Sequence, residues 1–250
     1  MLKNILQVFK YFIPDSIKPI LIQIYLKVFR PHVYKAQRDY KFTDEHLKFA
    51  HILECMNYVR VAGVENDIPP VYFEFGCHSG RTFSAAVRAA SYFKMKNAQF
   101  YAFDSFEGLP TTDATEDGIF QAGTFCTAQN DFINIVKKNS GLNLDSKHVV
   151  KGFYSNSLTS ELQARMPKVG VVHIDVDLYS STVDVLEFIK PLLVVGTVLV
   201  FDDWYCFSPG ANKGELRAVK EFCEENPLFK LEEWKSYSTF GKSFFVTSTP

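Results

Sequence analysis

The sequence has few cysteines, and none of them is arranged for metal binding or redox chemistry. Their number is odd, and no two are separated by the two residues of a Cys-x-x-Cys motif. A disulfide framework and a zinc finger are both disfavoured by this pattern, and a reducing compartment fits it best. The five cysteines are Cys55, Cys77, Cys126, Cys206 and Cys223.

An excess of charge of one sign is also missing. The 27 basic and 28 acidic residues leave a net charge of −1. A general nucleic-acid binder usually carries a clear basic excess, so nucleic acid is excluded as a partner. Hydrophobic residues make up 47% of the chain and charged residues 22%, which is typical of a globular protein and excludes a disordered chain, a collagen and a coiled coil.

No hydrophobic run is long enough to span a membrane. The longest, 191–201, falls far short of the roughly 20 residues that a spanning helix needs. Residues 1–30 are nevertheless apolar, with lysines interspersed, and they lack the features of a signal peptide. Two interpretations stay open: helices that pack on their own domain or on another subunit of a homo-oligomer, or a segment lying on a membrane surface. Both predict a cytoplasmic protein, and the second places it at the inner face of the membrane.

A cluster of helix-breaking residues divides the chain. Asn66-Asp67-Ile68-Pro69-Pro70 predicts a boundary between an N-terminal helical region, 1–68, and an α/β region, 69–250. The N-terminal region is expected to act as a lid, a subunit contact or a membrane-surface segment.

The second region alternates between β-rich runs and helical periodicity. This alternation predicts an α/β fold with a mostly parallel sheet covered on both faces and closed by an antiparallel pair. Ligands of such sheets bind beyond the carboxyl ends of the strands. The expected strands are 71–75, 99–103, 148–151, 169–174, 197–201, 229–234 and 243–247, and the expected helices are 81–96, one including 132–136, 180–193 and 214–225.

Two glycines follow the first expected strand. Gly76 and Gly80 allow a tight turn into a helix, and they let backbone amides approach a ligand closely. The G-x-x-x-G spacing differs from the dinucleotide fingerprint and is by itself also typical of a plain strand–helix turn. Asp104, at the end of the second strand, is placed to accept hydrogen bonds from ribose hydroxyls. The combination of the turn and the acid indicates a nucleoside cofactor.

Four aspartates follow the fourth and fifth expected strands. Asp175 and Asp177 come after one, and Asp202 and Asp203 after the other. Four uncompensated carboxylates in one cleft would repel each other strongly. A hard divalent cation resolves that repulsion, and ligation by oxygen alone favours Mg²⁺ over Zn²⁺. The alternative is that these residues are helix caps and loop acids.

Five motifs, in the same order along the chain, resemble the macrocin O-methyltransferase family, which methylates sugar hydroxyls of macrolide and aminocoumarin natural products. The resemblance covers about 70–250, while 1–68 matches poorly. It implies a class I methyltransferase fold with a seven-stranded sheet, S-adenosylmethionine as cofactor and a requirement for Mg²⁺. The motifs are Glu-Phe-Gly at 74–76, Phe-Asp-Ser-Phe-Glu-Gly-Leu-Pro at 103–110, Lys-Gly-Phe-Tyr-Ser at 151–155, Ile-Asp-x-Asp-Leu-Tyr-Ser-Ser-Thr at 174–182 and Phe-Asp-Asp-Trp at 201–204.

The resemblance also implies roles for individual residues. Asp177 matches the proposed general base, with His173 as the next candidate, and Cys77-His78 depart from the usual glycine loop. The implied metal ligands are Asp175, Asp202 and Asp203. The residues expected to bind the cofactor are Glu74, Gly76, Ser79, Gly80, Asp104, Ser105, Gly152 and Phe153.

The sequence therefore predicts a Mg²⁺-dependent O-methyltransferase acting on a sugar hydroxyl in a glycan or glycosylated natural product. A catechol-type O-methyltransferase acting on a small phenol and a catalytically silent cofactor-binding protein are the alternatives. The intact acids disfavour the silent protein, and the 104–110 motif favours the sugar over the phenol. The apolar N-terminus favours a glycan close to a membrane.

Overall fold

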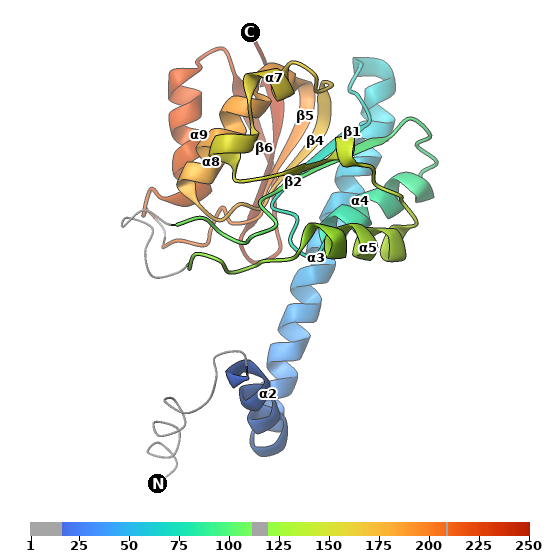
Figure 1. Cartoon of the computed structure of the whole chain (residues 1–250). Coiled ribbons are helices and arrows are strands. Elements are labelled where there is room, and N and C mark those ends of the chain that lie inside the picture. The colour runs from blue at the N-terminus through green and yellow to red at the C-terminus, as the bar shows by residue number, and fades with distance from the viewer. Residues whose placement is uncertain (1–16, 112–119, 209) are drawn as a thin grey trace. The chain divides into compact units, whose positions relative to one another are not determined.

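The computed structural model describes residues 17–111, 120–208 and 210–250 (Figure 1). The chain divides into two compact units, one ending at His46 and the other running from Leu47 to Pro250. The division falls inside the long helix α3 (Pro31–Asn66), whereas the boundary expected after residue 68 coincides with the passage from α3 to the first strand. The last turns of α3 are part of the second unit because four of their apolar side chains are buried in its core: Ile52, Cys55, Met56 and Val59.

The first unit contains α2 (Lys18–Phe29) and the start of α3. Of the two N-terminal helices expected, the earlier one, within 1–16, lies outside the described residues. Among the helices that the structure describes, none combines the length and the apolar composition that crossing a membrane requires. Most apolar side chains of α2 are exposed, namely Ile20, Leu21, Ile22, Ile24, Val28 and Phe29.

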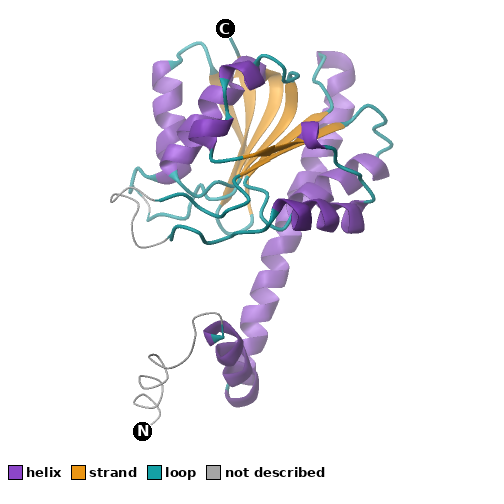
Figure 2. Ribbon diagram, viewed as in Figure 1, coloured by secondary structure: helices purple, strands orange, loops and turns teal. Residues whose placement is uncertain are grey.

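The second unit is built on one sheet, drawn in orange in Figure 2. The sheet has seven strands in the order β3-β2-β1-β4-β5-β7-β6. The first five strands pair in parallel, and β7 is antiparallel to both β5 and β6. This confirms the predicted fold class. The strands are β1 (Val71–Phe75), β2 (Gln99–Asp104), β3 (Val149–Lys151), β4 (Val169–Ile174), β5 (Leu193–Phe201), β6 (Lys230–Tyr237) and β7 (Gly241–Ser248).

Helices cover both faces of the sheet and enclose two apolar cores. Side chains of α3, α4 and α5 pack on one face, and those of α8 and α9 pack on the other. Alternation along β1 sends Tyr72 into the first core and Phe73 and Phe75 into the second. The helices are α4 (Arg81–Tyr92), α5 (Gln129–Ser140), α6 (Tyr154–Ser157), α7 (Ser160–Gln163), α8 (Tyr179–Ile189) and α9 (Gly214–Glu225), with short 3₁₀ turns at η1 (Ser146–His148) and η2 (Lys190–Leu192).

The largest departure from the expected elements lies between α8 and β5. A helix reaching residue 193 and a strand starting at 197 were expected, but α8 ends at Ile189 and β5 begins at Leu193. Pro191 does not fit the interior of an α-helix, and the β-branched Val194 and Val195 follow shortly after it. Gly196, with a φ of +91°, sits in an irregularity of the pairing between β4 and β5 that allows the strand to continue through it.

Strand register positions the candidate site. Phe75 at the end of β1 pairs with Phe103 of β2 on one side and with Ile174 of β4 on the other, and Ile174 in turn pairs with Phe201 of β5. The residues that follow these four strand ends therefore lie side by side along one edge of the sheet.

Candidate active site

The turn after β1 requires glycine at both of its predicted positions. Gly76 has a φ of +79° and Gly80 a φ of +67°, values that side chains with a Cβ rarely adopt. A Cβ at Gly76 would lie 1.7 Å from the carbonyl oxygen of Asp175, and one at Gly80 would lie 2.9 Å from Cγ2 of Val136. Tight packing against both β4 and α5 thus holds the turn.

Asp104 holds this turn through its carboxylate. One oxygen accepts hydrogen bonds from the backbone N–H groups of Cys77 at 2.7 Å and His78 at 3.1 Å, and the other accepts from Phe106 at 2.6 Å. The carboxylate that was expected to receive ribose hydroxyls therefore already organises two backbone segments, and spare lone pairs remain for a ligand. Ser105 shapes the next turn by donating a hydrogen bond to the carbonyl of Gly108 at 2.7 Å.

Glu74 lies beneath the turn, in the core. Its side chain has no exposure to solvent and accepts hydrogen bonds from the hydroxyls of Tyr72 and Thr82. Burial raises the pKa of Glu74 to about 8. The structure therefore does not bring Glu74 to the surface of the cofactor site, and any influence on the cofactor passes through the turn above it.

The remaining predicted cofactor residues lie at the same edge of the sheet. Ser79 is half-buried within the glycine turn. Gly152, directly after β3, donates its N–H to the carbonyl of Asp104 at 3.0 Å and has a φ of +136°. Phe153 precedes the short helix α6. Apart from Glu74, the predicted set is brought together by the ends of β1, β2 and β3.

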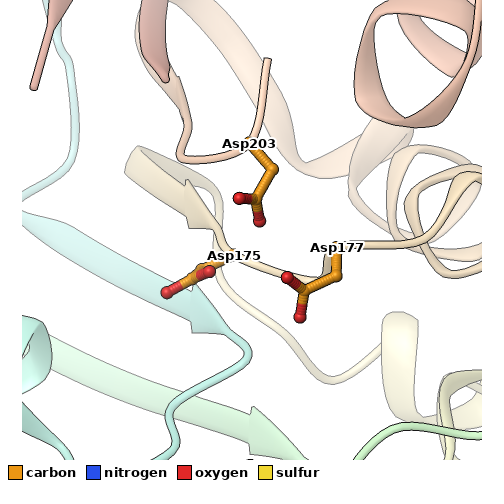
Figure 3. Close-up of side chains that lie close together, drawn as sticks. All are labelled: Asp175, Asp177 and Asp203. Atoms are coloured by element: carbon orange, nitrogen blue, oxygen red, sulfur yellow. The ribbon is translucent and has the colours of Figure 1, made fainter. Parts of the chain in front are cut away.

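Three aspartates converge beyond the ends of β4 and β5. Asp175, Asp177 and Asp203 each offer a carboxylate oxygen, and these three atoms lie within 4.8 Å of one another (Figure 3). Burial, and then the neighbouring carboxylates, raise the pKa of Asp175 and of Asp203 well above the ordinary value, and raise the pKa of Asp177 to about 7. Oδ2 of Asp203 is buried and has no hydrogen-bond partner in the described part of the chain.

Asp202 is not one of these three grouped carboxylates. It is 3% exposed, forms an ion pair with Lys48 of α3 and accepts a hydrogen bond from the hydroxyl of Tyr237 at 3.1 Å. The structure thus groups Asp177 with Asp175 and Asp203, whereas the predicted ligand set contained Asp202 and kept Asp177 as the base.

His173, the other candidate base, is fully buried in β4. Burial lowers its pKa to about 4, so the imidazole is neutral at physiological pH. Neither ring nitrogen has a hydrogen-bond partner among the residues described. Its Nδ1 lies 3.8 Å from a carboxylate oxygen of Glu74.

Two charged residues at the site were missed by sequence reasoning. Lys48 lies in the region that matched no motif, 154 residues before its partner Asp202. Glu215 begins α9, where an acid is typical of any helix N-terminus. It is 1% exposed, and Oε2 accepts a hydrogen bond from the N–H of Asp203 at 3.0 Å, while Oε1 has no partner within the described residues. The sequence carries no local signal for the role of Lys48.

Three features of this fold define a class of protein. They are the order of the strands, the antiparallel strand, β7, between β5 and β6, and the glycine turn followed by an acid at the end of β2. Together these are the features of a class I methyltransferase, an enzyme that uses S-adenosylmethionine. The fold and the enzyme class predicted from the motifs are both confirmed.

The particular family is given by the sequence itself. Residues 42–233 match the family described as macrocin-O-methyltransferase (TylF), and the chain belongs to this family. It is therefore an S-adenosylmethionine-dependent O-methyltransferase. Among curated protein sequences, none matches this chain.

Solved structures agree with the fold. The O-methyltransferase NovP is 21% identical with a TM-score of 0.60, over 80% of this chain and 79% of that one. The calicheamicin methyltransferase CalS11 is 17% identical with a TM-score of 0.60, over 97% of this chain and 90% of that one. An apo structure of CalS11, described as a TDP-rhamnose 3′-O-methyltransferase, is 17% identical with a TM-score of 0.53, over 97% and 92% of the two chains.

Proposed function

We propose that this protein transfers the methyl group of S-adenosylmethionine to a hydroxyl of a sugar, in a glycan or a glycosylated natural product, and that the reaction depends on Mg²⁺. The observation that carries the proposal is the half-buried cluster of Asp175, Asp177 and Asp203. Membership of the macrocin-O-methyltransferase family supports the sugar acceptor, as does the fold shared with a TDP-rhamnose methyltransferase.

The residues of the cluster fit a hard divalent cation. All the donor atoms are carboxylate oxygens, three of them are within 4.8 Å of one another, and one has no hydrogen-bond partner within the described residues. Burial, and then mutual repulsion, raise the pKa values of Asp175 and Asp203, and a cation would relieve the repulsion. We assign Asp175, Asp202 and Asp203 as its ligands, Asp202 turning from Lys48, and Asp177 as the general base.

The protein residues then divide the work of the reaction. The glycine turn, held by Asp104, positions the sulfonium, and a bound Mg²⁺ would lower the pKa of the sugar hydroxyl and orient it. Asp177 takes the hydroxyl proton while the oxygen forms a bond to the methyl carbon and the carbon–sulfur bond breaks. The products are the methyl ether, S-adenosylhomocysteine and a protonated Asp177. Holding both reactants in line supplies much of the remaining acceleration.

Methyl transfer from labelled S-adenosylmethionine tests this proposal. We expect transfer to nucleotide-linked sugars or glycans, little transfer to catechol, loss of activity in EDTA and recovery when Mg²⁺ is restored. Transfer to catechol alone would replace the sugar by a phenol. Full activity after exhaustive treatment with EDTA would reject the cation.

We also infer that the N-terminal segment contacts an anionic membrane surface. Residues 1–30 carry five basic residues and one acidic residue, and α2 exposes the apolar side chains of Ile20, Ile24 and Val28. A second copy of the same segment would bring like charges together, whereas anionic lipid headgroups attract them. A lipid-linked glycan is the acceptor that such an attachment would favour.

A further inference from the structure

Lys48 is a charged residue that the proposed reaction does not use. Its ammonium group pairs with Oδ2 of Asp202, and its side chain is 27% exposed while that of Asp202 is 3% exposed. Asp202 directly precedes Asp203 of the aspartate cluster. The ion pair therefore places a positive charge beside the acids that follow β4 and β5.

The helix that carries Lys48 is firmly attached beside the acids. Ile52, one turn further along α3, is fully buried. His51 stacks on the ring of Tyr237 with a centroid distance of 4.3 Å, and the hydroxyl of Tyr237 donates to the other oxygen of Asp202. The backbone at Lys48 is thus fixed, while its long side chain retains the freedom to turn toward solvent.

The surrounding charges explain why an ammonium group is held here. Glu215 adds a fifth carboxyl, which is buried next to the backbone of Asp203. Burying several carboxyl groups without a counter-charge is costly, so a nearby cation stabilises the folded chain. The ammonium of Lys48 occupies the acidic site from the side of Asp202.

We propose that Lys48 is an internal cation that neutralises the acidic site when no metal is bound and must leave Asp202 when a divalent cation binds. The inference rests on the proposed cation dependence. It makes Lys48 a competitor of the metal: its ion pair contributes to the stability of the metal-free protein and lowers the metal affinity. A lysine that merely braced the fold would not weaken metal binding.

The test is calorimetric titration of Mg²⁺ into full-length protein stripped with EDTA, together with thermal unfolding of the same metal-free samples. For Lys48→Met we expect Mg²⁺ to bind about tenfold more tightly or better, because a hydrogen bond to a charged group contributes free energy of that order. We also expect a lower melting temperature without metal and a larger increase on adding Mg²⁺. The two readouts change in opposite directions.

Lys235→Met is the matched control. Lys235 of β6 is 37% exposed and forms an ion pair with Glu54 of α3. Lys235→Met therefore also removes an ion pair made by α3, but the acid in this pair, Glu54, lies outside the aspartate cluster. We expect its Mg²⁺ affinity to equal that of the unmodified protein. If Lys48→Met does not fold, Lys48→Gln keeps a hydrogen-bond donor toward Asp202 while removing the charge, and the gain in affinity is expected again.

Each contrary outcome has a distinct meaning. Unchanged or weaker Mg²⁺ binding by both Lys48 variants, with normal binding by the unmodified protein, would overturn the inference and leave the proposed function standing. No binding of Mg²⁺ by any of the proteins would reject the proposed cation site, and the inference with it. An equal gain in affinity for Lys235→Met would show that general loosening of α3 causes the effect, which also overturns the inference.

Discussion

The two ends of the functional edge of the sheet treat their acids in opposite ways. At the end of β2, Asp104 accepts three hydrogen bonds from backbone N–H groups. Beyond β4 and β5, three aspartates crowd together, and the pKa of each is raised. The carboxylate at the first end is satisfied by the protein, while those at the second end oppose one another.

The difference indicates which end needs a ligand in order to be stable. A carboxylate that is hydrogen-bonded within the protein stabilises the fold by itself. A buried carboxylate facing others of its kind costs stability until a proton or a cation relieves it. The turn beyond β1 is therefore formed by the protein alone, whereas we expect the aspartate cluster to be completed by the proposed cation.

The largest effect on activity is expected from neutralising Asp177, the proposed general base at the second end. Asp177→Asn preserves the shape of the side chain but cannot accept the hydroxyl proton, so turnover is expected to fall by roughly 10²–10⁴-fold. Steady-state kinetics on the sugar acceptor measures this, with Asp184→Asn on α8, a half-buried aspartate outside the cluster, as the control. Cofactor affinity should be almost unaffected. Recovery of Asp177→Asn with excess Mg²⁺ would instead make Asp177 a ligand.

The satisfied end is tested with Asp104→Ala. Three backbone N–H groups lose their acceptor and the cofactor loses a charged partner, so S-adenosylmethionine should bind more weakly by about 1.5–3 kcal/mol, or roughly 10–150-fold. Calorimetry measures the affinity, and Mg²⁺ binding to the same variant should remain normal. An unaltered cofactor affinity would remove Asp104 from the cofactor site.

The aspartate cluster should make the stability of the metal-free protein fall as the pH rises. The folded-state pKa of Asp177 lies at about 7, above its ordinary value of 3.8, so the folded protein holds a proton that the unfolded chain releases. Its contribution to stability is complete below about pH 4 and is lost as the pH rises through 7. In EDTA, the melting temperature should therefore fall between pH 5 and pH 8. A melting temperature that rises over this range would contradict the interpretation of the cluster.

Metal binding should show the same linkage. Because Mg²⁺ binds carboxylates in their ionised form, its binding near pH 6.5 should release protons and strengthen as the pH rises. Calorimetry in two buffers with different ionisation enthalpies measures the number of protons released. Release of no proton would mean that the aspartates are already ionised without metal.

The smallest effect on catalysis is expected from substitutions in α2, a helix of the first unit that contributes to neither end of the site. Replacing Ile20, Ile24 and Val28 with serine should abolish co-sedimentation with anionic vesicles and leave turnover on a water-soluble sugar acceptor unchanged. Serine at Val64, Tyr92 and Leu228, which are equally exposed apolar residues of the second unit, is the control and should not alter vesicle binding. A change of oligomer in light scattering, with vesicle binding intact, would assign α2 to subunit contact.

The sequence predicts those features of the fold and the site that depend on residues close together in the chain. The acids at strand ends could be placed because a β-rich run followed by Asp104 or Asp175 indicates both the strand and its end. The contacts of each side chain could not be predicted, so neither the ion pair of Asp202 nor the burial of Glu74 in the core was expected. Lys48 meets Asp202 across 154 residues, and a contact of that range leaves no local pattern.

The contact between Gly76 and Asp175 has a consequence for protein engineering. A Cβ at Gly76 would lie 1.7 Å from the carbonyl oxygen of Asp175, so the backbones of the two ends touch without any side chain between them. Acceptor range is commonly altered by exchanging segments between relatives, and a crossover between 76 and 175 would join backbones that were never fitted to each other. Chimeras should therefore inherit both segments from one parent, and diversification is better directed at loops that do not contact this point.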